Sequence, residues 1–197
     1  MYKKEERKVQ RHFQMALSHG ERAELLRGAR KTIEVYLLEE GMVPWEPAGS
    51  LREKGGAFVT LEKRGALRGC IGHMAADRPL YLTVQEMAIQ AATGDPRFPP
   101  VRPEEVGEIG IEISVLSPLK RVAGPEEIRV GEHGIAVSRG AHRGILLPQV
   151  ATREGWDREK FLGMTCLKAG LPFDAWKSGE VTIEVFSAEV FGEKETP

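Results

Sequence analysis

Asparagine is absent from this chain of 197 residues, and cysteine occurs only twice, as Cys70 and Cys166. Two cysteines so far apart give no disulfide framework, and they are typical of free thiols in a reducing compartment. A papain-like protease orients its histidine with asparagine or aspartate, so Asp95 or Asp157 would have to take that role here. Without a nucleophile elbow or protease signature, the sequence gives little support to a cysteine hydrolase.

Long apolar runs and an excess of charge of one sign are also missing. No apolar segment approaches the ~20 residues needed to cross a bilayer, and the charged first 14 residues contain no apolar region typical of a secretory signal. We therefore expect a cytoplasmic protein without membrane contact. Because the formal net charge is -1, no electrostatic argument points to nucleic acid as a partner.

Helix and strand signals are interspersed without a repeat or a βαβ rhythm. Helices are predicted from a capping box at Ser18 and Glu21 to about Leu38, from Pro79 to about Thr93 with Asp77 as the cap, and from Asp157 to Ala169. Strands are predicted at 57–62, 66–71, 109–115, 134–139, 143–147 and 181–190. The chain length allows one domain or a main domain with a smaller lobe. This order favours an α+β fold with an antiparallel or mixed sheet and flanking helices.

The strands at 57–62 and 66–71 form the best hairpin candidate. A two-residue turn would force Arg64 to positive φ, whereas a three-residue loop Lys63-Arg64-Gly65 places only Gly65 there, so we predict the three-residue loop. In that register Glu62 faces Ala66. One face of the hairpin is then uniformly apolar, comprising Ala57, Val59, Leu61, Leu67, Gly69 and Ile71. The other face carries Phe58, Thr60, Glu62, Arg68 and Cys70.

The segment Leu67-Arg68-Gly69-Cys70-Ile71-Gly72 is the most informative motif of the chain. Glycines within a strand mark a bulge or a close approach, and a cation beside a thiol stabilises the reactive thiolate. Cys70 and Arg68 are therefore the candidate catalytic residues. The alternative is that Cys70 is a small buried apolar residue, as most free cysteines are. No lysine or immediate helix follows Gly72, so the motif is not a phosphate-binding loop.

Five motifs in this order resemble the AMMECR domain family, whose prokaryotic members are called AmmeMemoRadiSam system protein A. They are Leu-Arg-Gly-Cys-Ile-Gly at 67–72, Asp-Pro-Arg-Phe-Pro-Pro at 95–100, Glu-Ile-Ser-Val-Leu at 112–116, Leu-Pro-Gln-Val at 147–150 and Lys-Ala-Gly-Leu at 168–171. The resemblance implies a domain at 16–191, with an appendage at 1–15 and a tail at 192–197. It also implies an α+β fold with a larger and a smaller subdomain.

The family name associates its prokaryotic members with a Memo-like protein and a radical SAM protein. The resemblance therefore implies a component of a pathway with these partners, with an unknown cofactor and no agreed reaction. The hexapeptide at 67–72 is the part of the family most often proposed as functional.

Candidate ligand-binding residues extend the site beyond the hexapeptide. They are Arg68, Gly69, Cys70, Gly72, Asp95, Arg97 and Gln149. Asp95 and Arg97 either contact a ligand, for which a guanidinium suits planar anions, or form an internal ion pair that braces a proline-rich loop. Gln149 either lines the same cleft or ties down a turn. Cys166 is expected to be structural.

Cys70 and His73 have the spacing of half a metal site, but a complete site would need further ligands, so we predict no metal. The sequence leaves three functions open. The first is a ligand-binding or partner-binding component with its site at Arg68 and Cys70. The second is an enzyme with Cys70 as nucleophile and His73 as base, which requires Gly72 to turn the chain. The third is a protein-interaction module without catalysis.

Overall fold

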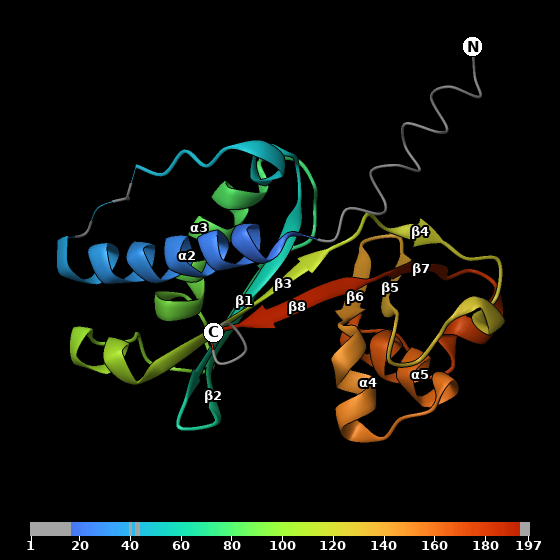
Figure 1. Ribbon diagram of the computed structural model, residues 1–197. Coiled ribbons are helices and arrows are strands. Elements are labelled where there is room, and N and C mark those ends of the chain that lie inside the picture. The colour runs from blue at the N-terminus through green and yellow to red at the C-terminus, as the bar shows by residue number, and fades with distance from the viewer. Residues whose placement is uncertain (1–16, 40, 42–43, 194–197) are drawn as a thin grey trace, which may run out of the picture. The chain divides into compact units, whose positions relative to one another are not determined.

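The computed structural model describes residues 17–39, 41 and 44–193, and the predicted appendage at 1–15 lies outside them. The described residues form two compact units, one within residues 17–116 and 189–193 and the other at 117–188 (Figure 1). Each unit contains a four-stranded sheet, and all the pairings with a resolved register are antiparallel. The predicted α+β class, with a larger and a smaller subdomain, is confirmed.

In the first unit, one face of the sheet is packed against two helices. The strand order is β2-β1-β3-β8, and the bounds are β1 Gly56–Lys63, β2 Ala66–His73, β3 Ile109–Leu116 and β8 Ala188–Gly192. The helices are α2 His19–Glu39 and α3 Leu80–Thr93, with short 3-10 turns at Gly49–Arg52 and Pro103–Glu108. Leu25, Val59 and Ile113, which are fully buried, belong to the core between helices and sheet. Burial of each such side chain stabilises the fold by about 1.5–3 kcal/mol.

The capping box predicted at the start of α2 is confirmed. The backbone N–H of Ser18 donates to Glu21 Oε2 at 2.8 Å, and the N–H of Glu21 lies 3.3 Å from Ser18 Oγ. A hydrogen bond from Ser50 is the largest cause that lowers the pKa of the Glu21 carboxyl, followed by hydrogen bonds from the hydroxyl and the backbone N–H of Ser18. The predicted cap of α3 is wrong, because Asp77 pairs with His73 and Arg78 while Pro79 precedes the helix without a side-chain cap.

The predicted three-residue loop of the hairpin is also wrong. Lys63 pairs directly with Ala66, so the turn consists of Arg64 and Gly65, with φ values of +54° and +81°. Positive φ at both turn residues gives the two-residue geometry that matches the twist of antiparallel strands. This match outweighs the cost of about 1 kcal/mol for a left-handed arginine.

A bulge in β2 compensates for the shorter turn. Glu62 pairs with Leu67 and Leu61 pairs with Gly69, so that Arg68 is the additional residue. Beyond the bulge, Gly69 returns to the face of Leu61, as predicted. Leu67, in contrast, was expected on the apolar face and is 43% exposed.

The second unit has the strand order β4-β7-β5-β6. Its strands are β4 Lys120–Arg121, β5 Gly134–Arg139, β6 His142–Leu146 and β7 Thr182–Phe186. Helices α4 Pro148–Glu154 and α5 Arg158–Lys168 accompany the sheet, with 3-10 turns at Pro125–Glu127 and Ala175–Ser178. Phe161 and Ile135, with no exposed surface, belong to its core. The predicted cap by Asp157 is confirmed, since its carboxylate accepts the N–H of Lys160 at 2.8 Å.

The last predicted strand, 181–190, is two strands that belong to different sheets. The interruption is at Ser187, whose backbone N–H donates to Ser117 Oγ and whose carbonyl accepts the N–H of Ser117, both at 2.9 Å. β7 therefore belongs to the second sheet and β8 to the first. Helix α4 was not predicted: Pro148 follows directly after the predicted strand at 143–147, and it is the first residue of this helix.

Candidate functional site

Cys70 lies on β2, which is an edge strand of the first sheet. It is opposite Thr60 of β1, and Thr60 Oγ1 is 3.3 Å from Cys70 Sγ. Successive side chains of a strand alternate between the two faces, so Cys70 and Thr60 share the face opposite to the apolar stripe of Val59 and Leu61. The expectation that the thiol avoids the helix-covered core is confirmed. Cys70 is partly exposed.

The two glycines beside Cys70 are required for different reasons. A Cβ at Gly69 would lie 2.1 Å from the backbone oxygen of Ala91 in α3, so only glycine permits this approach of strand and helix. A Cβ at Gly72 would lie 2.1 Å from the ring of Phe58. Gly69 therefore lets β2 pack closely against α3, and Gly72 makes room for the Phe58 ring on the other face of the sheet.

Asp95 and Arg97 occupy the outer edge of β2 at Cys70. The backbone N–H of Cys70 donates to Asp95 Oδ2 at 2.8 Å, and Arg97 Nη2 donates to the carbonyl of Cys70 at 3.2 Å. Arg97 also binds the Asp95 carboxylate through Nε at 2.9 Å and through Nη2 at 2.6 Å. Asp95 thus accepts from the N–H of Cys70 and Arg97 donates to its carbonyl, as the backbone of a neighbouring strand would do. The predicted brace of the proline-rich loop also fixes the backbone of the hexapeptide.

Asp95 and Arg97 each stabilise the charged form of the other. The Asp95 side chain is almost completely buried, whereas 55% of the Arg97 side chain is exposed. Hydrogen bonds from Arg97, followed by those from the Cys70 and Arg97 backbone, hold the pKa of the Asp95 carboxyl well below its ordinary value despite burial. The Asp95 carboxylate raises the pKa of Arg97 in turn, with a smaller contribution from Cys70.

Arg68 is engaged elsewhere. Its guanidinium donates to both carboxylate oxygens of Glu105, at 3.3 and 3.0 Å, and to the carbonyl oxygens of Pro99 and Pro100. The expectation that Arg68 activates the thiol is therefore not supported, since the described cation that bonds to Cys70 is Arg97. Hydrogen bonds from Arg68, the Arg102 backbone and Lys63 lower the pKa of Glu105 to about 2.

The register across the sheet brings together residues that the sequence analysis did not single out. Thr60 pairs with Cys70 on one side and with Glu112 of β3 on the other. A thiol, a hydroxyl and a carboxylate thus form one row across three strands. Apolar residues occupy every second position in 109–115, which indicates that Glu112 faces away from the core. Only the order of the strands in the sheet places it beside Thr60.

His73 is not positioned as a base for Cys70. β2 continues as a strand to His73, so Gly72 does not turn the chain and side chains three residues apart lie on opposite faces. His73 Nε2 is instead 3.0 Å from Asp77 Oδ1. Among residues 17–39 and 44–193, no group of three histidine, cysteine or acidic side chains is arranged to hold a metal ion.

Gln149 belongs to the second unit, in the first turn of α4. Its Oε1 is buried and has no hydrogen-bond partner within the described part of the chain. Its proposed role as a ligand-binding residue stays a prediction. Cys166 lies in the same unit, with no exposed surface, and burial raises the pKa of its thiol.

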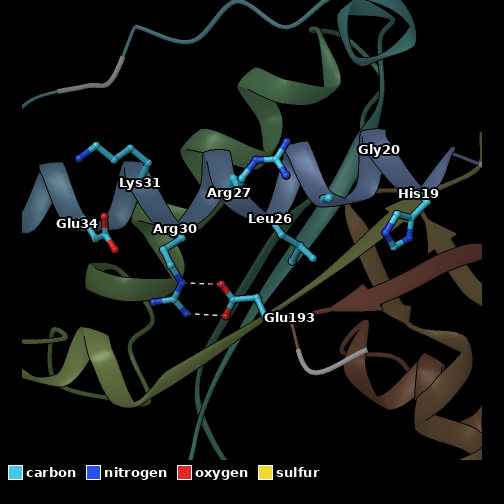
Figure 2. A pocket seen from close by; sticks show the side chains of 9 residues that line it. His19, Gly20, Leu26, Arg27, Arg30, Lys31, Glu34 and Glu193 are labelled. Atoms are coloured by element: carbon cyan, nitrogen blue, oxygen red, sulfur yellow. Dashed lines mark hydrogen bonds and ion pairs between the residues drawn. The ribbon is translucent and has the colours of Figure 1, made fainter. Parts of the chain in front are cut away.

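A groove of about 660 Å³ runs along α2 (Figure 2). It is lined by His19, Gly20, Ala23, Leu26, Arg27, Arg30, Lys31, Glu34 and Glu193. Figure 2 shows Arg30 and Glu193 facing each other, with Arg30 Nε and Nη2 each 2.5 Å from a carboxylate oxygen. Glu193, within the predicted tail at 192–197, also accepts the N–H of Ile111. The lining contains none of the predicted site residues.

We expect iodoacetamide to modify Cys70 at least about tenfold faster than Cys166 in the folded protein, because the alkylated species is an accessible thiolate. Cys70 is partly exposed, whereas Cys166 is buried with a raised pKa. Mass spectrometry of the digested protein after timed labelling measures both rates. Equal rates in the native state would contradict the prediction, and equal rates in denaturant are the control.

The fold and the site define an α+β protein of two units, with a cysteine on an edge strand fixed by an aspartate and an arginine. Residues 26–191 match the sequence model of the AMMECR1 family. The chain belongs to this family, as its motifs predicted. In the described part of the chain, no helix is both long and apolar enough to cross a membrane.

Relatives and a solved structure support this assignment. The chain is 53% identical over 182 residues to Protein MK0488 of Methanopyrus kandleri, with 87% of each chain covered. It is 48% identical over 185 residues to a protein of Methanothermobacter thermautotrophicus, covering 90% of this chain and 96% of the relative. The crystal structure of uncharacterized protein PH0010 from Pyrococcus horikoshii matches with a TM-score of 0.83 and 42% identity, covering 87% of this chain and 91% of that one.

Proposed function

We propose that this protein is a cytoplasmic ligand-binding or partner-binding component of a pathway that includes a Memo-like protein and a radical SAM protein. Its binding site is centred on the hexapeptide at 67–72. The observation that supports this proposal best is the position of Cys70. Its sulfur lies on the sheet face that α2 and α3 do not cover, while Asp95 and Arg97 fix its backbone from the edge.

The number of groups that hold this strand segment in place argues for a role beyond packing. An almost completely buried carboxylate, an arginine and two closely packed glycines hold one strand segment in place. Binding sites require side chains held by rigid elements and by supporting hydrogen bonds. A thiol and a hydroxyl presented side by side on such a strand suit recognition of a polar ligand group.

Binding of the purified Memo-like and radical SAM proteins, and of a metabolite library, tests the proposal. We expect at least one of them to bind the wild type and to bind Cys70→Ser about tenfold more weakly, because the sulfur contact is lost. Isothermal titration calorimetry measures the affinity, and thermal unfolding measures stability in parallel. Arg102→Ala is the control, since this arginine lies in the same unit and its side chain is 80% exposed.

The other outcomes distinguish the remaining functions. If Cys70→Ser lowers only the stability and every affinity is unchanged, the site proposal is wrong and Cys70 is structural. If Cys70→Ser leaves binding unchanged but abolishes the conversion of a bound metabolite by the wild type, the protein is an enzyme with Cys70 as nucleophile. If partner binding persists and is sensitive only to substitutions outside 67–72, the protein is an interaction module with a different surface.

A further inference from the structure

The outer edge of β2 has one occupied position and one open position. In an antiparallel pair, residues alternate between those that bond to the partner strand and those whose N–H and C=O point away from it. Cys70 is of the second kind, since both of its backbone groups bond to Asp95 and Arg97. Gly72, two residues further along, is therefore of the same kind. Within residues 17–39 and 44–193 no hydrogen bond fills its outward N–H or C=O.

A cation lies next to this open position. Along the edge the outward groups follow in the order Cys70 N–H, Cys70 C=O, Gly72 N–H and Gly72 C=O. Arg97 bonds to the second of these groups, so its guanidinium is adjacent to the third. Arg97 bonds to Asp95 through Nε and Nη2, and 55% of its side chain remains exposed to a ligand. An acceptor with a negative charge is thus favoured at the Gly72 N–H.

An aromatic ring lies directly beside Gly72. The ring of Phe58 lies so close to Gly72 that it occupies the place of a side chain there. In an added strand, the residue opposite Gly72 places its own side chain on this same face. An apolar side chain would therefore contact the Phe58 ring.

From these three observations we infer that the β2 edge binds the carboxyl-terminal residue of an extended peptide. The terminal carboxylate accepts hydrogen bonds from the Gly72 N–H and from Arg97, and the last peptide N–H donates to the Gly72 carbonyl. Charge complementarity selects the antiparallel direction, which brings the carboxylate end of the peptide to Arg97. This direction also explains why the ligand ends there, since Asp95 and Arg97 block further pairing at Cys70. The inference rests on the proposed binding role of the hexapeptide and names its ligand class.

A pool of random heptapeptides, prepared once with free carboxyl ends and once as amides, provides the probe. We expect the immobilised protein to enrich the free-acid pool, with an apolar last residue. The best selected sequence should bind at least about tenfold more weakly as the amide, because the charged acceptor is lost. Arg97→Gln should abolish this preference, and Arg102→Ala should retain it.

Hydrogen exchange gives a second measurement that does not depend on a variant. In the free protein we expect the Cys70 amide, which is bonded to Asp95, to exchange more slowly than the Gly72 amide. Addition of the selected peptide should then protect Gly72.

Equal enrichment of acid and amide pools, or a Gly72 amide that the selected peptide leaves unprotected, would overturn the inference. If the pathway proteins still bind in a Cys70-dependent way, the proposed function survives that result. If neither the pathway proteins, the metabolites nor the peptides bind, both proposals fail.

Discussion

Gly69→Ala is expected to lower the free energy of unfolding by about 3 kcal/mol, the upper part of the usual range for overpacking. The new Cβ would lie 2.1 Å from the backbone oxygen of Ala91, and its next contact is the carbonyl carbon of the same residue. A side chain could rotate away from such a contact, but a helix backbone cannot. The strand and α3 must therefore separate, and denaturant unfolding followed by circular dichroism measures the loss.

Two matched variants make this prediction specific. Gly107→Ala should leave stability within about 0.5 kcal/mol, because a Cβ there meets nothing within 4 Å. Gly72→Ala should cost less than Gly69→Ala, because the ring of Phe58 can move. An equal loss for Gly69 and Gly107 would show that the contact with α3 does not decide the effect.

Asp95→Asn is expected to destabilise the protein by about 2 kcal/mol at pH 7, since hydrogen bonds to a charged group are lost. The exposure of Arg97 keeps the effect below that of a fully buried pair. The folded-state pKa of Asp95 lies well below the reference value of 3.8. Its contribution to stability is therefore complete above that value and declines as the pH falls through the lowered pKa.

The difference in the free energy of unfolding between wild type and Asp95→Asn should accordingly be constant above about pH 5. It should narrow progressively below about pH 4. Urea unfolding of both proteins at pH values from 3 to 8 measures it, because other carboxyl groups titrate equally in the two proteins. Glu104→Gln, which changes an exposed carboxylate in the same unit, is the control. An undiminished difference at low pH would mean that the charge of Asp95 is not what stabilises the edge.

Prediction of the hairpin shows where local reasoning succeeded and where it failed. The alternation of apolar residues correctly placed Cys70 opposite to the covered face. The preference against a left-handed arginine led to the wrong turn, because the gain from a turn that fits the strand twist is decided by both strands together. The bulge at Arg68 then moved its guanidinium to Glu105, a partner 37 residues away.

The sequence by itself determined the family, the α+β class, the capping of α2 and α5, and the face on which Cys70 lies. Each of these depends on residues close together in the chain or on a motif. Only the tertiary structure decided that Arg97 and not Arg68 bonds to Cys70, that Glu112 joins the row of Thr60, and that the last strand divides at Ser187. These contacts depend on strand order and on loops that return from distant segments, and local propensity carries no information about them.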